Sequence, residues 1–131
     1  MITNSVEETV QAGKVFAGKL EKDAVVLLYG EMGAGKTHFV KGMALGLGID
    51  SVITSPTFAI VNDYEKLIHF DLFRIQSEDD LYAMGFYDYI GNGVLAIEWA
   101  ENIPELQQEF DKYYKVEINK TDENKREIIG T

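Results

Sequence analysis

The sequence predicts an α/β fold: a single domain, residues 1–131, with a mixed parallel and antiparallel β-sheet flanked by helices. An apolar, β-branched run at residues 24–29 is followed by a glycine-rich loop and a helix-compatible stretch at 38–47. A second continuous apolar run, residues 94–98, ends on a carboxylate and is typical of a strand buried on both faces. Further pairs of short apolar runs predict two hairpins, 58–64 with 67–73 and 112–120 with 126–130.

The composition describes a compact globular protein. With 131 residues, 46% of them hydrophobic, and two prolines, the chain fits one domain of ordinary size. It has no cysteine, which excludes disulfides, zinc-thiolate sites and thiol catalysis. No apolar run is long enough to cross a membrane, and the N-terminus lacks a basic segment followed by an apolar one. A cytoplasmic protein without membrane contact is therefore expected.

The net charge of −10 bears on the partners of the chain. Tight nucleic-acid binding draws on clustered lysines and arginines, but here the lysines are scattered and only Arg74 and Arg126 are arginines. Direct binding to DNA or RNA is not expected. An acidic surface suits docking onto a basic protein, or solubility alone.

The loop at residues 30–37, Gly-Glu-Met-Gly-Ala-Gly-Lys-Thr, matches the Walker A pattern G-x-x-x-x-G-K-[ST] at every fixed position. Glycines let successive backbone N–H groups turn towards a phosphate, and the helix that follows adds the partial positive charge of its N-terminus. Lys36 is expected to reach the β- and γ-phosphates, and the Thr37 hydroxyl to ligate Mg²⁺. The predicted nucleotide-binding residues are Glu31, Met32, Gly33, Ala34, Gly35, Lys36, Thr37 and His38.

Two helices have clear start signals. A capping box at Ser5 opens a helix predicted to reach about Leu20. Ser77 and three acidic residues open another, which ends at Gly85. The first is expected to be scaffold, and the acids of the second to favour its N-terminus and face solvent.

Residues 51–58 are rich in hydroxyl side chains and follow the phosphate loop closely. In proteins with this loop, a segment here often closes over the γ-phosphate, with a serine or threonine sensing it. Ser55 and Thr57 are the candidates for such a switch-like role. An ordinary Ser-Pro turn explains the segment equally well.

Asp71 lies inside an otherwise apolar strand, where a carboxylate is costly unless it is paired or functional. It is a candidate for positioning an attacking water or a metal-bound water; a solvated strand face or an ion pair is the alternative. His69 shares its face of the strand because side chains alternate. His69 and His38 are interpreted as structural, since no third ligand forms a metal pattern with them.

Glu98 closes the run at 94–98. In open α/β sheets, ligands lie beyond the carboxyl ends of the strands, so Glu98 is expected beside the phosphate loop. There it would act on Mg²⁺ directly or through water, as the acid of a Walker B strand does; a strand end that meets solvent is the alternative. Trp99, the only tryptophan, is either a core anchor or a lid near the nucleotide.

Five signatures occur together and in order, and this combination resembles the TsaE (YjeE) family, the small bacterial ATPases of tRNA threonylcarbamoyladenosine synthesis. The resemblance spans roughly residues 3–130, with mild departures at His38, Ala59 and Phe73, where Thr or Ser, Thr, and Tyr are usual. The signatures are the phosphate loop, Ser-Pro-Thr-Phe at 55–58, His-Phe-Asp-Leu-Phe-Arg at 69–74, the acidic helix at 78–85, and Glu98-Trp99.

The resemblance implies slow Mg²⁺-dependent ATP hydrolysis coupled to a TsaB–TsaD complex, in which TsaD transfers the threonylcarbamoyl group to tRNA. The TsaE-like subunit resets that complex and meets tRNA only through it. By the same resemblance, Lys36 holds phosphates, Thr37 and Glu98 serve Mg²⁺, and Asp71 and Glu98 support hydrolysis. Thr57 belongs to the switch-like loop, and Trp99 lies near the nucleotide.

Three other functions are alternatives. Asn-Lys-Thr-Asp at 119–122 matches a guanine-reading pattern, and residues 88–91 supply D-x-x-G, but a hairpin turn explains the first better and no buried strand precedes the second. A small-molecule kinase needs more cations to clamp its second substrate than two arginines provide. A nucleotide-gated binding module with incidental hydrolysis stays open.

Overall fold

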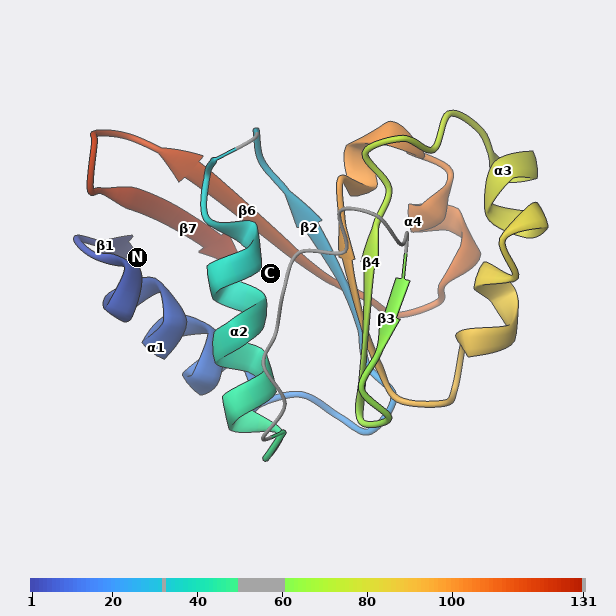
Figure 1. Ribbon diagram of the computed structural model, residues 1–131, viewed down its shortest axis with the longest axis horizontal. Coiled ribbons are helices and arrows are strands. Elements are labelled where there is room, and N and C mark those ends of the chain that lie inside the picture. The colour runs from blue at the N-terminus through green and yellow to red at the C-terminus, as the bar shows by residue number, and fades with distance from the viewer. Residues whose placement is uncertain (32, 50–60, 131) are drawn as a thin grey trace.

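The computed structural model describes residues 1–31, 33–49 and 61–130. In this part of the chain, seven strands form one sheet in the order β1-β7-β6-β2-β5-β4-β3 (Figure 1). The strands are β1 (Ile2–Thr3), β2 (Val25–Tyr29), β3 (Val61–Asp63), β4 (Leu67–Asp71), β5 (Val94–Glu98), β6 (Tyr114–Lys120) and β7 (Arg126–Gly130).

The centre of the sheet is parallel and its edges are antiparallel. β2 pairs in parallel with β5 and β6, and β5 pairs in parallel with β4. β3 and β7 are added antiparallel through hairpins, and β1 pairs antiparallel with β7. The predicted mixed sheet and both hairpins are confirmed. Because the central strands are parallel, the carboxyl ends of β2, β4, β5 and β6 lie at one edge of the sheet.

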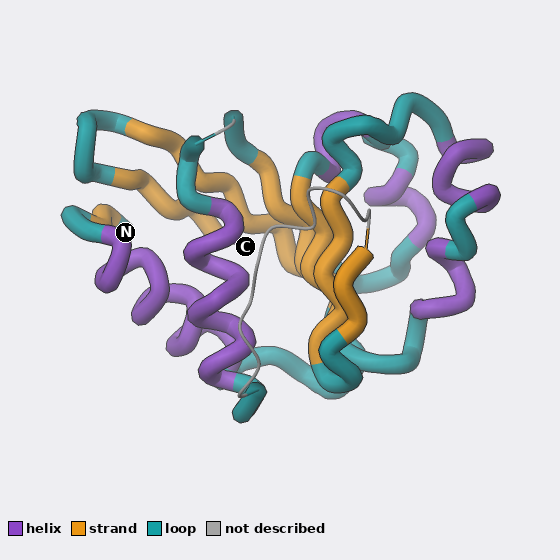
Figure 2. The backbone as a smooth tube through the Cα atoms, viewed as in Figure 1, coloured by secondary structure: helices purple, strands orange, loops and turns teal. Residues whose placement is uncertain are grey.

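Helices cover both faces of the sheet (Figures 1 and 2). One face carries α1 (Val6–Ala17) and α2 (Lys36–Gly46), and β2 sends Val26 and Leu28 towards them. The other face is covered by α3 (Glu78–Ala83), the 3₁₀-helices η1 (Phe86–Tyr89) and η2 (Ala100–Asn102), and α4 (Leu106–Glu109). Val25 and Leu27 of β2 pack into this second cluster. The alternation explains why β2 reads as a continuous apolar run.

Two glycines fix the position of the helix that follows the phosphate loop. A Cβ at Gly42 of α2 would lie 1.8 Å from the carbonyl oxygen of Val10 in α1. A Cβ at Gly13 of α1 would lie 2.1 Å from the carbonyl oxygen of Phe39 in α2. The two helices therefore touch backbone to backbone, and no larger residue fits at either contact.

Element boundaries differ from the predictions in a few places. α1 ends at Ala17 rather than Leu20, α2 begins two residues earlier than expected, at Lys36, and β6 begins at Tyr114. The Ser5 cap is confirmed, since its hydroxyl accepts from the Glu8 backbone N–H at 3.1 Å. β1, η1, η2 and α4 were not predicted, because each is too short to show a period. Residues 58–60 of the first predicted hairpin strand lie outside the described residues.

Candidate nucleotide-binding site

The phosphate loop leaves the carboxyl end of β2 and enters α2 directly. Gly30, Gly33 and Gly35 have φ angles of 144°, 80° and 104°, a region that side-chain-bearing residues rarely adopt. Gly30 also lies against β6, where a Cβ would be 2.4 Å from the carbonyl oxygen of Ile118. The backbone thus needs glycine at these three positions. Met32, Ser55 and Thr57 lie outside the described residues.

Lys36 places a buried ammonium group inside the loop. It is the first residue of α2, 4% exposed, and its Nζ donates to the Gly30 carbonyl. The same Nζ lies 3.6 Å from the centroid of the Trp99 ring. Burial lowers the pKa of Lys36, while the charges of Glu101, Glu98 and Asp71 oppose that shift. Burial removes much of the hydration of the Lys36 ammonium, which favours its binding to an anion.

Glu98 meets Thr37 across the edge of the sheet. Glu98 ends β5, beside Leu28 of β2 and Asp71 of β4 in the parallel register. Its side chain is almost fully buried and accepts from the Thr37 hydroxyl at 3.2 and 3.4 Å, to its two carboxylate oxygens. The alternative of a strand end that meets solvent is wrong. A hydroxyl and a carboxylate in contact at a helix N-terminus are hard oxygen ligands of the kind Mg²⁺ takes.

His69 holds the other side of the Glu98 carboxylate, and sequence reasoning missed it. The imidazole is fully buried, and its Nε2 bonds to Glu98 Oε2. Among the described residues, its Nδ1 has no hydrogen-bond partner. The available signal was the shared strand face of His69 and Asp71, combined with the parallel pairing of β4 with β5.

Asp71 lies at the rim of the site, half-buried, with Oδ1 accepting from the Phe73 backbone N–H at 2.9 Å. Burial raises its pKa and the charge of Glu98 adds to the rise, while the bond from Phe73 and the charges of His69 and Lys36 oppose it. Among the described residues it forms no ion pair. The carboxylates that end β4 and β5 therefore differ in environment, since Glu98 is enclosed and Asp71 is partly open to solvent.

Trp99 and Glu101, which follow β5, contact residues of the phosphate loop. Trp99 has a φ of 60°, is half-buried, and its ring contacts Phe73 at 5.0 Å between centroids. Together with the Lys36 contact, this places the tryptophan at the loop rather than in the deep core. Glu101, which sequence reasoning did not single out, accepts from the Gly30 N–H through Oε2 at 3.1 Å. It tethers the first glycine of the loop.

Two basic side chains flank the loop on its other side. His38 follows Thr37 in α2, and its pKa is lowered by burial and then by the charges of Lys41 and Arg126. Arg126, at the start of β7, donates through Nη2 to the Gly33 carbonyl at 3.3 Å. The guanine-reading pattern at 119–122 lies at the end of β6 and in the hairpin turn, as predicted. Asp88 of the D-x-x-G pattern lies in η1 rather than after a strand.

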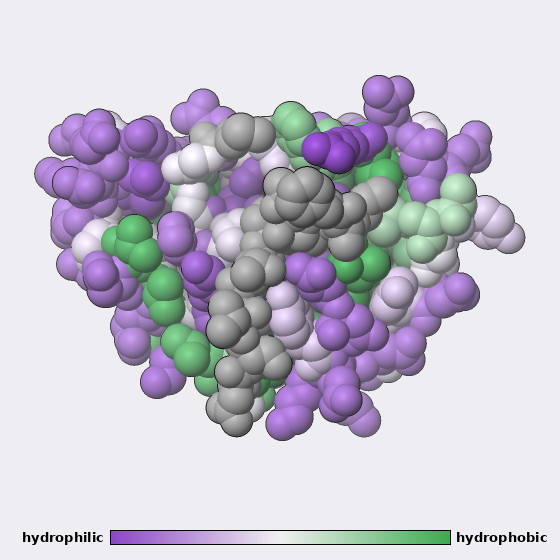
Figure 3. Space-filling model, in the orientation of Figure 1, coloured by the Kyte–Doolittle hydropathy of each residue, from purple (hydrophilic) through white to green (hydrophobic). Residues whose placement is uncertain are grey.

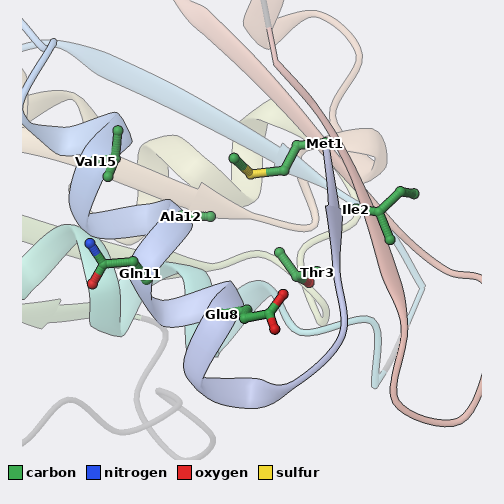
Figure 4. Close-up of a pocket in the computed structure, with 7 residues that line it drawn as sticks. All are labelled: Met1, Ile2, Thr3, Glu8, Gln11, Ala12 and Val15. Carbon is green, nitrogen blue, oxygen red and sulfur yellow. The ribbon is translucent and has the colours of Figure 1, made fainter.

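A separate hollow of about 200 Å³ lies between β1 and the outer face of α1 (Figure 4). It contains none of the predicted site residues, and its one carboxylate, Glu8, already serves the start of α1. Figure 3 shows hydrophobic side chains in a row over α1, and a further group on the right-hand half of the same view. No helix in the described ranges is long and apolar enough to cross a membrane. Among the described residues, the polar and charged side chains suited to catalysis therefore gather at the phosphate loop.

Comparison with known proteins gives the family. The family model for the threonylcarbamoyl adenosine biosynthesis protein TsaE matches residues 3–128. A protein named tRNA threonylcarbamoyladenosine biosynthesis protein TsaE from Aquifex aeolicus is 39% identical over 98% of this chain and 92% of its own. The protein of the same name from Bacillus subtilis is 38% identical over 98% of this chain and 82% of its own.

A solved structure agrees in fold. The crystal structure of Bacillus subtilis YdiB superimposes with a TM-score of 0.76 at 29% identity, covering 98% of this chain and 80% of the other. A match of this extent covers the sheet, the phosphate loop and the hairpins together. The chain belongs to the TsaE family.

Proposed function

We propose that this chain is a cytoplasmic, Mg²⁺-dependent ATPase that serves tRNA threonylcarbamoyladenosine synthesis together with TsaB and TsaD. The observation that carries the proposal is that Glu98, about sixty residues further along the chain, meets Lys36 and Thr37 of the phosphate loop at one sheet edge. The pathway, tRNA threonylcarbamoyladenosine biosynthesis, is inferred from membership of the TsaE family.

The residues present fit a nucleoside triphosphate with its metal. Three loop glycines with positive φ carry no side chain that would hinder a phosphate, and the N-terminus of α2 adds its partial positive charge at the same place. The Thr37 hydroxyl and the Glu98 carboxylate are already in contact, so both can serve one Mg²⁺, directly or through water. When bound, the metal neutralises charge on the phosphates.

Lys36 supplies the cation that binds the phosphates. In the structure its Nζ contacts the Gly30 carbonyl and the Trp99 ring, two neutral partners that phosphate oxygens can replace. Because the ammonium is already desolvated, the exchange adds attraction without a large further loss of hydration. Lys36 therefore binds the β- and γ-phosphates.

Glu98 and Asp71 have different roles in hydrolysis. Glu98 is held by Thr37 and His69, which fix it as a positioning group for the metal. Asp71 is partly exposed to solvent, and its raised pKa makes it a better proton acceptor than an ordinary aspartate. It orients the attacking water and accepts its hydrogen bond.

The acidic surface supports a role that depends on protein partners. With a net charge of −10 the chain repels the phosphates of tRNA, so TsaB and TsaD provide the contact with tRNA. The ATP cycle resets their complex between turnovers.

Reconstituted tRNA modification tests this proposal and separates it from a gated binding module. Glu98→Gln and Asp71→Asn are expected to bind ATP but not to sustain repeated rounds of threonylcarbamoyladenosine formation with TsaB and TsaD. Exposed Glu105→Gln is the matched control and should act like wild type. Sustained modification by the two hydrolysis-deficient variants would show that nucleotide-gated docking is the whole function.

A further inference from the structure

The turn between β6 and β7 lies at the same sheet edge as the phosphate loop. β2 and β6 are parallel neighbours, so both end at that edge, and residues 121–125 continue directly from β6. In the strand order, β5 and β4 lie on one side of β2, and β6 and β7 on the other (Figure 1). The loop is thus flanked by Glu98 and Asp71 on one side and by the hairpin turn on the other.

This asymmetry orients a bound nucleotide. Under the proposed function, Thr37, Glu98 and Asp71 take the metal and the terminal phosphate, which places that end of the ligand on the β5 side. The nucleoside end must then leave the loop on the opposite side. On that side the described residues nearest the loop are Arg126, after the β6–β7 turn, and Thr9 of α1.

Arg126 is held in place by backbone carbonyls. Its Nη2 donates to Gly33 O at 3.3 Å, which ties the hairpin to the phosphate loop. Its Nη1 donates to the carbonyls of Asp122, Glu123 and Lys125 at 3.2, 3.3 and 3.0 Å. Among the described residues no carboxylate forms an ion pair with it. The guanidinium is therefore a fixed, charged plane whose terminal N–H donors are directed at carbonyls.

The Arg126 side chain lies against the phosphate loop at Gly35, where the Thr9 side chain also approaches. A Cβ at Gly35 would lie 3.7 Å from Arg126 Nε and 4.0 Å from its Cγ. The charge of Arg126 is also felt at His38, in the first turn of α2, where it adds to the effects of burial and Lys41 in lowering the pKa. The Arg126 side chain is thus next to Gly33, Gly35 and the first turn of α2.

We propose that Arg126 is the platform on which the purine base of the nucleotide stacks, with the β6–β7 turn as the wall of the base site. With its terminal donors on carbonyls, what the guanidinium offers a ligand is its flat face, which binds aromatic rings by stacking and cation–π attraction. Stacking accepts either purine, so Arg126 contributes affinity for ATP and GTP alike.

Titration calorimetry with Mg²⁺-ATP and with Mg²⁺-tripolyphosphate tests this, because tripolyphosphate has the phosphates and no base. Arg126→Gln and Arg126→Lys are each expected to weaken ATP binding about tenfold while tripolyphosphate binding stays within about twofold of wild type. Arg126→Lys retains the charge and a donor for Gly33 but not the plane, so it decides the matter if Arg126→Gln disturbs the loop. Unchanged tripolyphosphate binding also shows that the variants are folded.

Two results would overturn the inference. An equal loss for ATP and tripolyphosphate in Arg126→Lys means that Arg126 pairs with phosphates or merely supports the loop. Unchanged ATP binding in both variants means that the base lies elsewhere. If wild type binds no nucleoside triphosphate at all, the proposed function itself fails, which is a different outcome from either of these.

Discussion

Asp71 and Glu98 are paired neighbours in the parallel strands β4 and β5, so one register brings both carboxylates to the same end of the sheet. Both side chains point to the face that carries α2, since Leu67 and Ala96, at positions of the same parity, pack into the cluster with α2. Glu98 is almost fully buried and Asp71 is half-buried, and this difference underlies the two roles assigned to them.

Asp71→Asn is expected to stabilise the protein while reducing ATP hydrolysis by at least about a hundredfold. Burial raises the folded pKa of Asp71 above its ordinary 3.8, so the folded state binds the proton more tightly than the unfolded state. Stability from this group falls as the pH rises from 3.8 through the folded pKa, and the full penalty is present at neutral pH. Asparagine carries no charge and can still accept from the Phe73 N–H.

Urea unfolding of wild type and Asp71→Asn between acidic and neutral pH checks this expectation. The variant should have the higher midpoint at neutral pH, and the difference should shrink as the pH falls towards 3.8. A variant that is less stable than wild type at neutral pH would mean that the carboxylate is paired and not penalised.

His69 is expected to act through Glu98. Glutamine can place its amide nitrogen near the position of the imidazole Nε2, whereas asparagine is too short, so only His69→Gln keeps the bond to Glu98. His69→Asn should lose about 10- to 100-fold in hydrolysis, the usual effect of releasing a group that orients a metal ligand.

ATP hydrolysis and the Mg²⁺ concentration for half-maximal rate, measured for both His69 variants, test this role. His69→Gln should recover most of the rate and of the apparent metal affinity. Equal loss in both variants, at equal thermal stability, would mean that the imidazole does more than hold Glu98.

The fluorescence of Trp99 is expected to report phosphate binding. Trp99 is the only tryptophan, and the Lys36 ammonium lies 3.6 Å from its ring centroid. When Lys36 turns to phosphates, the ring loses this cation and its emission should change on adding Mg²⁺-ATP. Lys36→Met should show no such change, and Lys19→Ala, at an exposed lysine, should respond like wild type. A full response in Lys36→Met would refute the coupling.

Gly42→Ala is expected to lower the free energy of unfolding by about 3 kcal/mol, because its methyl group would overlap the Val10 carbonyl. Gly18→Ala is the control, since Gly18 has a φ of −65° and a Cβ there would lie 3.4 Å from the nearest atom, the Val15 carbonyl oxygen. Chemical denaturation of both variants measures the difference. Similar stabilities would show that α1 and α2 can separate at no cost.

Much of the fold was predictable because its central elements have strong local signals. β2 and β5 are continuous apolar runs, and the loop between β2 and α2 has a fixed glycine pattern. The capping serines of α1 and α3 accept the backbone bonds expected of them. Each of these features depends on residues within one turn or one strand, so the sequence shows them directly.

The missed features depend on contacts between distant segments. His69 became a site residue only when the parallel pairing of β4 and β5 placed it against Glu98. Glu101 and Arg126 reach the loop from η2 and β7, and no local pattern marks either of them. The contact of Gly13 with α2 likewise follows from how two helices pack, which their separate sequences do not specify.

The most direct test of the central claim is Mg²⁺-dependent ATP hydrolysis, measured with and without purified TsaB and TsaD, for wild type, Lys36→Ala and Glu98→Gln. The account predicts slow hydrolysis by wild type, stimulation by the pair, and loss of activity in both variants. GTP measured in parallel tests the guanine-reading alternative. Preference for GTP, or hydrolysis indifferent to TsaB and TsaD, would contradict the account.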